Sequence, residues 1–253
     1  MKNIIINWFH EYTSSYFQND DHSPYYLKYI HSIKVSENAR NIALEIGLTP
    51  QETDIAEIIG ILHDIGRFDQ FAKYNTFNDK VSLDHAEHSV NILEKNQIPG
   101  SFDRSIREII IKSIRYHNKK DIPQENLTDE ETIFAKIIRD ADKIDIYRVM
   151  AEQLKNPEID KKTLFLNQSE EITYSAPILE AVKHHKLANL QDMRTIADFR
   201  LIQLSWIFDI NFPVTYKLLK SQGYFSYLLS SMPGKNQIEQ ELKEINHHIK
   251  QLT

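Results

Sequence analysis

Apolar residues recur at three- and four-residue spacing along most of this sequence, and that spacing constrains the fold more than any other feature. Ile30, Ile33 and Ile42 repeat in this way between residues 24 and 47, and a similar run occupies residues 51–64. The recurrence is the period of an amphipathic helix. Only 6 glycines and 8 prolines occur in 253 residues, which is few for a turn-rich β fold. The sequence therefore predicts an all-α protein.

No internal repeat, low-complexity tract or Gly/Ser linker divides the chain. We expect a change near residue 155, because the residues after it form an irregular insertion and the C-terminal part carries no recognisable chemical motif. Residues 1–155 are then one helical domain, and residues 156–253 a C-terminal helical extension that packs on it as part of one structural unit. Helices of the extension are predicted near 178–189, 194–210, 214–222 and 236–251.

Cysteine is absent, which excludes disulfides, thiolate metal sites and cysteine nucleophiles. A metal bound by this chain must use nitrogen and oxygen ligands. The formal net charge of −6 argues against a general surface for polyanions, so we expect no extended nucleic-acid binding. No apolar run approaches the roughly 20 residues that span a bilayer, and the N-terminal apolar stretch is too short for a signal peptide. We expect a cytoplasmic protein without membrane contact, and a homo-oligomer stays open.

The stretch "ILHDIGRFD" sets His63 and Asp64 directly against apolar residues that a helix would bury. We expect this helix to end at Gly66, so that both side chains lie on its last turn. The same juxtaposition recurs in four other predicted helices. Their ionisable residues within or beside the apolar pattern are His31, His85, His117 and Asp142.

Capping residues predict where two of these helices begin. Ser82 is the predicted N-cap of the helix that contains His85. Thr128 and Glu131 form a predicted capping box that opens the helix with Asp142.

A lone histidine on an apolar helix face is more often a core residue bonded to the backbone than a ligand. Five successive helices with such residues favour a shared centre, because buried ionisable groups are costly unless they are paired or coordinated. A divalent metal is the simplest centre that compensates several of them at once. Imidazole and carboxylate together suit zinc, iron, manganese or nickel, and a carboxylate can bridge two ions.

His31, the pair His63 and Asp64, and Asp142 in "RDADKID" resemble the H…HD…D signature of the HD-domain superfamily of metal-dependent phosphohydrolases. The resemblance covers roughly residues 25–150. It implies a compact helical bundle in which these four residues bind a metal, with the C-terminal helices as an addition.

Asp140 is the rival of Asp142 in this signature. Family motifs of the form A-D-x-L place the ligand just before the x, and the stretch "ADKI" puts Asp142 in that register. Asp140 then contacts a metal ligand rather than the metal itself, or it lies on the helix surface. His88 and Asp145 are further candidates for a place behind the ligands, and His88 is also a substitute for the neighbouring His85.

The resemblance extends to family members that hold two metals. His85 in "HAEHSVNIL" is similar to their H-P-x-x-G stretch, with Ala86 in the proline place and Ser89 in the glycine place, and His117 resembles their next histidine. This implies one or two divalent transition-metal ions (Fe, Mn, Zn, Ni or Co, with Mg as a further option). In the binuclear case Asp64 bridges the ions, and His85 and His117 hold the second.

The activity implied by the resemblance is cleavage of a phosphoester by a metal-bound hydroxide, with a nucleotide or similar small phosphorylated molecule as substrate. Asp64, Arg67 and Lys143 are the predicted catalytic residues; the two cations clamp phosphate oxygens or are solvated surface charges. Asp69 or Asp145 orients water or protonates the leaving group, or is a helix-surface carboxylate. Two alternatives stay open: a di-iron oxygenase with the same ligands, and a non-catalytic sensor module that retains the metal.

Overall fold

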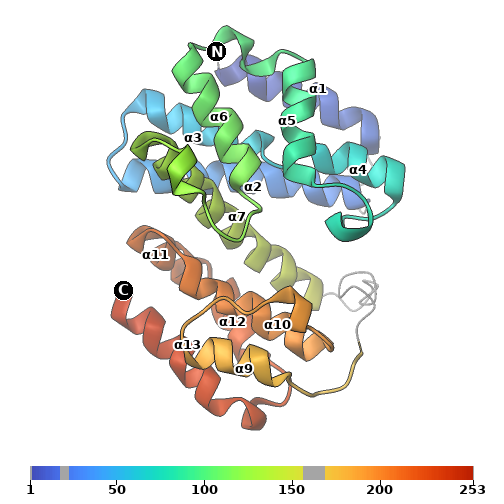
Figure 1. Cartoon of the computed structure of the whole chain (residues 1–253), viewed down its shortest axis with the longest axis vertical. Coiled ribbons are helices and arrows are strands. Elements are labelled where there is room, and N and C mark those ends of the chain that lie inside the picture. Colours follow the sequence, from blue (N-terminus) through green and yellow to red (C-terminus); the bar gives the residue numbers. More distant parts are fainter. Residues whose placement is uncertain (1, 18–22, 156–168, 253) are drawn as a thin grey trace. The chain divides into compact units, whose positions relative to one another are not determined.

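The computed structural model describes residues 2–17, 23–155 and 169–252, and its regular elements are helices (Figure 1). Over these ranges no strand forms, and the β contact is an isolated bridge between Ser169 and Thr195. The all-α prediction is confirmed. The helices are α1 (Lys2–Phe17), α2 (Pro24–Glu45), α3 (Pro50–Leu62), α4 (Gly66–Tyr74), α5 (His85–Lys95), α6 (Arg104–Tyr116), α7 (Asp129–Lys155), α9 (Ala176–Lys183), α10 (Ile196–Ser205), α11 (Pro213–Gln222), α12 (Tyr224–Ser230) and α13 (Glu239–Leu252).

Two compact units divide the chain, Met1–Asp145 and Ile146–Thr253, and the division falls within α7. The domain boundary predicted near residue 155 lies at the C-terminal end of the same helix. That the C-terminal extension packs on the first unit stays a prediction.

Helices α2 and α3 pack closely because a glycine faces a small residue. A Cβ atom at Gly60 would lie 2.6 Å from Cα of Ser36, so only glycine allows this approach. The Ser36 hydroxyl donates to the carbonyl of Glu57 at 2.8 Å and joins the two helices further. This contact holds His31 of α2 near His63 at the end of α3.

The prediction that Gly66 ends the helix is wrong. His63 is already the C-cap of α3, and Gly66 begins α4 without the positive φ of a terminating glycine. The reason for glycine here is space, since a Cβ atom would lie 2.6 Å from the carbonyl oxygen of His85 and 2.7 Å from the backbone nitrogen of Ser89. The Gly66 N–H also donates to the Ser89 hydroxyl at 2.9 Å. The turn that carries Asp64 is thereby fixed against the start of α5.

The N-cap of α5 is Asp84, whereas the sequence predicted Ser82. The Asp84 carboxylate accepts from two backbone N–H groups of the first turn, at 3.0 and 3.3 Å. A carboxylate caps a helix as well as a hydroxyl does. Ser82 instead donates to the carbonyl of Asn78 at 2.8 Å, within the preceding loop. His85 is therefore the first residue of α5.

Helix α6 ends beside a candidate ligand, and helix α7 begins at the predicted capping box. His117 is the C-cap of α6. The predicted capping box is confirmed, because the Thr128 N–H donates to the Glu131 carboxylate at 2.8 Å and the Glu131 N–H donates to the Thr128 hydroxyl at 3.2 Å. The Asn38 amide donates to the Ala141 carbonyl at 3.3 Å and ties α2 to α7.

The second unit consists of the end of α7 and of α9 to α13. Helices α10, α11 and α13 lie within or close to the predicted ranges, whereas α9 ends at Lys183, earlier than predicted. Helix α12 was not predicted; Gly223, with φ of 73°, separates it from α11. Of the predicted irregular insertion, residues 156–168 lie outside the described residues and residues 169–175 form no helix.

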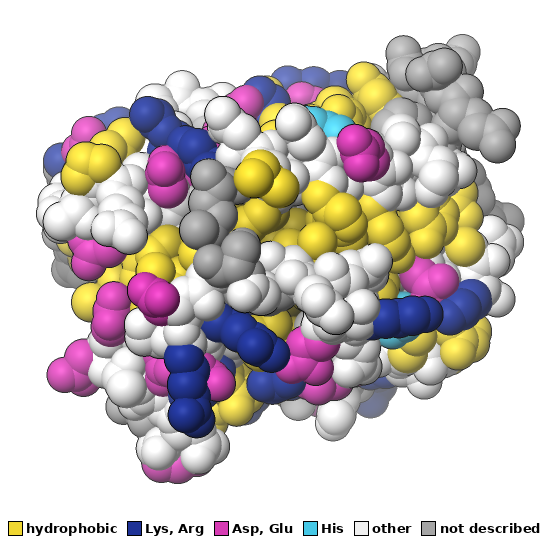
Figure 2. Space-filling view, turned by 90° about the horizontal axis from the view of Figure 1, so that it is seen from above, with side chains coloured by type: hydrophobic (Ala, Val, Ile, Leu, Met, Phe, Trp, Pro, Cys, Tyr) yellow, Lys and Arg dark blue, Asp and Glu magenta, His cyan; other side chains and the backbone are white. Residues whose placement is uncertain are grey.

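Charged side chains of both signs are interspersed over the face shown in Figure 2, around a band of hydrophobic ones. Neither sign forms an extended patch on this face. No described helix combines the length and hydropathy that a bilayer crossing requires. The prediction that the chain makes no extended nucleic-acid contacts stays a prediction.

Candidate metal centre

Six ionisable side chains, each on a helix, a helix end or the turn after α3, lie together in the first unit. The structure brings together all the residues that the sequence suggested as ligands. The four imidazoles and one of the carboxylates are at most 6% exposed. We call this group the ligand cluster, and its members are His31, His63, Asp64, His85, His117 and Asp142.

The first half of the ligand cluster surrounds Oδ2 of Asp64. Nε2 of His31 lies 3.6 Å from this oxygen, and Nε2 of His63 lies 3.7 Å from it. Oδ1 of Asp142 completes the half, at 3.1 Å from His31 Nε2 and 3.7 Å from His63 Nε2. Two imidazole nitrogens and two carboxylate oxygens thus face one another, a donor set that suits a divalent transition metal.

The second half surrounds the other oxygen of the same carboxylate. Oδ1 of Asp64 lies 3.5 Å from His85 Nε2 and 3.8 Å from His117 Nε2. The two Nε2 atoms are 3.1 Å apart. Asp64 therefore presents one oxygen to each pair of histidines, which is the arrangement that a bridging carboxylate requires.

All four imidazoles are oriented by an acceptor at Nδ1, at 2.5 to 2.7 Å. Each ring consequently directs Nε2 into the ligand cluster, as metal-binding histidines do. The acceptors are Asp145 Oδ2 for His31, the Gly60 carbonyl for His63, Asp79 Oδ2 for His85 and the Ile114 carbonyl for His117.

The Nε2 atoms themselves are poorly satisfied by the protein. Among the described residues, Nε2 of His31 and Nε2 of His63 are buried and make no hydrogen bond of good geometry, although Asp142 Oδ1 lies 3.1 and 3.7 Å from them. Because Nδ1 of His85 and Nδ1 of His117 each donate to an oxygen, their Nε2 atoms meet lone pair to lone pair when the rings are neutral. Such a contact is repulsive without a cation between them, so the donor set fits one or two divalent metals.

Electrostatics keep the central carboxylate charged and the second pair of histidines neutral. Burial alone would raise the pKa of Asp64, but the positive charges of Lys28 and of the neighbouring histidines hold that pKa well below its usual value. Burial and the charge of His85 lower the pKa of His117 to about 3. Burial likewise lowers the pKa of His85. A charged carboxylate beside the neutral imidazoles of His85 and His117 is the protonation state that binds metal.

Of the predicted phosphate-binding cations, Arg67 is largely engaged within the protein. Its guanidinium donates to Oδ1 of Asp79 at 2.7 Å and to the carbonyl of Phe77 at 2.5 Å. These bonds hold the loop that supplies Asp79 to His85. Lys143 is half-buried directly after Asp142, and its role stays a prediction.

A cation that the sequence reasoning missed lies closer to the centre. Nζ of Lys28 is 2.7 Å from Oδ2 of Asp64. Lys28 precedes His31 by three residues, so both lie on one face of α2. That spacing was the available signal. Asp79, the partner of His85, could not be found from helical spacing, because it lies in the loop before α5.

The residues predicted to lie behind the ligands differ in their placement. Asp145 is buried and bonded to His31, and Asp140 is fully buried in α7. His88 pairs through Nε2 with Oδ2 of Asp69 at 2.6 Å, a hydrogen bond between α4 and α5.

A third group of Asp79, Asp84 and His85 also has ligand atoms close together. Both of its carboxylates already face cations, Arg67 for Asp79 and Lys119 for Asp84. This group is therefore balanced by the protein itself.

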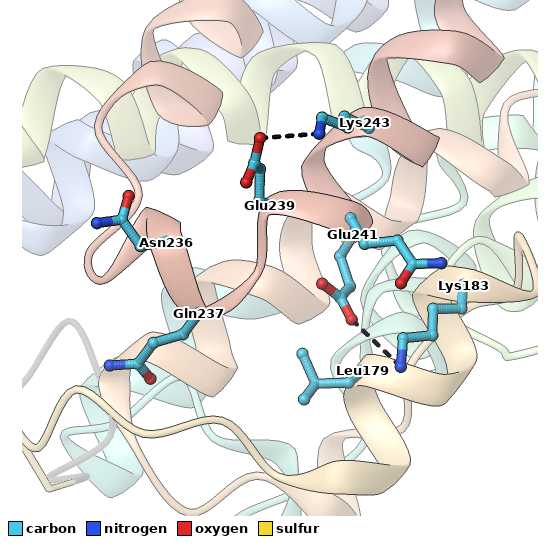
Figure 3. A pocket seen from close by; sticks show the side chains of 8 residues that line it. Leu179, Lys183, Asn236, Gln237, Glu239, Glu241 and Lys243 are labelled. Carbon is cyan, nitrogen blue, oxygen red and sulfur yellow. Dashed lines mark ion pairs between the residues drawn. The ribbon is translucent and has the colours of Figure 1, made fainter.

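A hollow of about 570 Å³ lies in the second unit, between α9, the 3₁₀ turn Lys235–Gln237 and the start of α13 (Figure 3). Glu241 is buried beside it and faces Lys183 at 3.6 Å, and Glu239 pairs with Lys243 at 2.8 Å. No residue of the ligand cluster lines this hollow.

Comparison with known proteins gives one match. A family model described as "HD domain" matches residues 29–147, a span that contains the whole ligand cluster. No curated protein and no solved structure matches the chain.

Proposed function

Through residues 29–147 the chain belongs to the HD-domain superfamily, and we propose that it is a metal-dependent phosphohydrolase acting on a nucleotide or a similar small phosphorylated molecule. Proteins with this domain are mostly metal-dependent hydrolases. The observation that carries the proposal is the position of Asp64, with one oxygen facing His31 and His63 and the other facing His85 and His117.

The ligand set favours two ions over one. Oδ2 of Asp64 with Asp142 and the first histidine pair suits one ion, and Oδ1 with the second pair suits another. A divalent metal at such a site supplies Lewis-acid neutralisation of phosphoryl charge and a hydroxide nucleophile near neutral pH. Iron, manganese, zinc, nickel or cobalt would all suit these nitrogen and oxygen donors.

The chain's own residues position this chemistry. Asp145 holds the ring of His31, and Asp79 holds that of His85, so that both direct Nε2 inward. Lys28 and Arg67 carry positive charge beside Asp64, where the charge of a phosphoryl group would need compensation. Arg67 also fixes Asp79, so its contribution to substrate binding is partly indirect.

Burial of the ligand cluster supports a small substrate. Its imidazoles are at most 6% exposed, and Asp142 has the most open side chain, at 19%. The reacting phosphoryl group must reach these side chains, which is easier for a mononucleotide or sugar phosphate than for a folded polymer.

Elemental analysis of the untagged protein, combined with a screen of phosphate esters, tests the proposal. The screen should include nucleoside monophosphates, triphosphates, cyclic dinucleotides and dinucleoside polyphosphates. We expect one or two equivalents of divalent metal per chain and hydrolysis of at least one class. His63→Ala should lose both, whereas His184→Ala, an exposed histidine of the second unit, should retain both.

The same experiment distinguishes one bound ion from two, and it distinguishes a phosphohydrolase from a di-iron oxygenase and from a sensor module. His117→Ala should reduce a stoichiometry of two to one. Full metal content and full hydrolysis in His63→Ala would contradict the proposal. Oxygen consumption by an iron-loaded protein that hydrolyses nothing would favour the di-iron oxygenase, and metal retention without either reaction would favour the sensor module.

A further inference from the structure

Lys28 occupies an unusual position for a lysine, against the central carboxylate of a histidine cluster. Its Nζ lies 2.7 Å from Oδ2 of Asp64, and its side chain is 19% exposed where that of Asp64 is 4% exposed. The ammonium also lies 5.6 Å from the centre of the Phe77 ring, within the range of a cation–π contact. It is thus held between a carboxylate and an aromatic ring at the edge of the ligand cluster.

The ion pair with Lys28 compensates the buried negative charge of Asp64 in the metal-free protein. Asp64 is buried, and a buried carboxylate is costly without a compensating positive charge. Lys28 supplies it at 2.7 Å from Oδ2, whereas the other nearby cation, Arg67, has its Nε 3.6 Å from Oδ1.

The oxygen that Lys28 contacts is also needed by the metal. Oδ2 of Asp64 is the atom that faces Nε2 of His31 and Nε2 of His63, so it belongs to the first half of the ligand cluster. An ammonium and a divalent ion at the same oxygen repel each other strongly at contact distance.

From this conflict we infer that Lys28 is an exchangeable counter-ion of the metal site. It neutralises Asp64 when no metal is bound, and it leaves Oδ2 when a metal takes that oxygen. Because the Lys28 side chain is flexible, its ammonium group can move from Oδ2 toward the Phe77 ring and still remain at the edge of the ligand cluster. Lys28 therefore lowers metal affinity while it stabilises the metal-free fold.

This inference rests on the metal site of the proposed function and is independent of the substrate. The test variant is Lys28→Met, which keeps the stem and removes the charge, and Lys28→Arg keeps the charge. Lys34→Met is the matched control on the same helix, because Lys34 is exposed and pairs only with Glu37 in the described contacts, at 2.9 Å.

Metal-free proteins are titrated with Zn²⁺ or Mn²⁺ in competition with a chromophoric chelator at fixed pH. We expect Lys28→Met to bind the metal about tenfold more tightly than the wild type, since one opposing charge is gone. Lys28→Arg and Lys34→Met should stay within about twofold of the wild type, because the local charge or the site is unchanged. In thermal unfolding, metal-free Lys28→Met should melt below the metal-free wild type, and metal should raise its melting temperature by more.

Unchanged or weaker metal binding by Lys28→Met would overturn the inference. An equal gain in Lys34→Met would also overturn it, because the effect would then be general electrostatics. If the wild type binds metal and Lys28→Met shows no gain, the counter-ion role alone fails. If the wild type binds no divalent metal at all, the proposed function fails and the counter-ion role fails with it.

Discussion

Each unit of the protein buries more than one carboxylate, and Asp64 of the first unit and Asp198 of the second are satisfied in different ways. Asp198 of α10 is fully buried and accepts from the backbone N–H groups of Ser175 and Arg194 and from the Ser175 hydroxyl, at 2.7 to 3.0 Å. Asp64 is surrounded by a lysine and by histidines, and within the described part of the chain the buried Nε2 of His31 makes no hydrogen bond of good geometry.

The difference separates a structural charge from a functional one. Around Asp198, neutral N–H and O–H donors of described residues satisfy the carboxylate and hold the ends of the neighbouring loops. Around Asp64, neighbouring imidazole nitrogens are not satisfied by hydrogen bonds, and a metal cation would coordinate them. A buried carboxylate is therefore informative about function mainly through the state of its partners.

The largest expected effect separates the two carboxylates directly. Asp64→Ala should abolish metal binding and reduce hydrolysis by more than about 100-fold, since loss of a residue behind a ligand already costs about 10- to 100-fold. Asp198→Ala should keep the metal but lose about 3 kcal/mol of unfolding free energy, because its buried donors are left unpaired. Elemental analysis and urea denaturation measure the two outcomes.

Full metal content in Asp64→Ala would place the site elsewhere. Loss of metal in a folded Asp198→Ala would show that the two buried carboxylates do not differ in the way described.

The next effect concerns the carboxylate that orients a ligand. Asp145→Asn keeps the shape of the side chain but weakens the bond to Nδ1 of His31, which is 2.7 Å long. We expect metal affinity to fall by about 10- to 100-fold, as it does for residues behind metal-binding histidines. Chelator competition measures it, and an unchanged affinity would mean that His31 needs no orienting partner.

The acid sensitivity of the metal-free protein should also trace to the ligand cluster. Burial and the charge of His85 lower the pKa of His117 to about 3, whereas an unfolded histidine titrates near about 6.5. Below pH 6.5 the unfolded chain therefore binds a proton that the native chain does not. His117 consequently costs stability as the pH falls from about 6.5 to about 3, by up to about 1.4 kcal/mol per pH unit.

His117→Gln removes this titration. In urea unfolding with a chelator present, the stability of the wild type relative to His117→Gln should decline between pH 7 and pH 4. A difference that is independent of pH would contradict the assignment.

The smallest effect is expected at the histidine nearest in sequence to a ligand. His88 pairs with Asp69 and lies outside the ligand cluster. His88→Gln should keep the metal stoichiometry and hydrolysis within about twofold, and should lose about 1 kcal/mol of stability or less, since the pair is partly exposed. Loss of one ion in His88→Gln would make this residue a ligand in place of His85.

The ligand cluster was predictable because its members lie on helices, at helix ends or, for Asp64, in the turn directly after α3. His31 and Asp142 sit within apolar helical patterns, and His63, His85 and His117 lie at helix ends that the same patterns locate. Periodicity placed the helices, and the resemblance to a known family ordered the ligands. Both kinds of signal are local in the sequence.

The remainder of the site depends on contacts that no local pattern records. Asp79 reaches His85 through the path of the loop between α4 and α5, and a loop has no period from which a direction can be read. The helical period of α2 places Lys28 on the same face as His31. Only the structure shows that Lys28 contacts Asp64 and therefore belongs to the site. Helix α12 was missed because seven residues are too few to show a period.

Gly66 was misread because the sequence alone does not distinguish a glycine needed for its dihedral angle from one needed for its size. In this protein the absent methyl group lets the backbone after Asp64 touch the carbonyl of His85 and the nitrogen of Ser89. A larger residue at this position would clash with the backbone of His85 and Ser89, so the turn after Asp64 and the start of α5 could not approach as closely. In the proposed two-metal site, Gly66 binds no metal itself, yet its lack of a side chain is what allows His85 to lie beside Asp64.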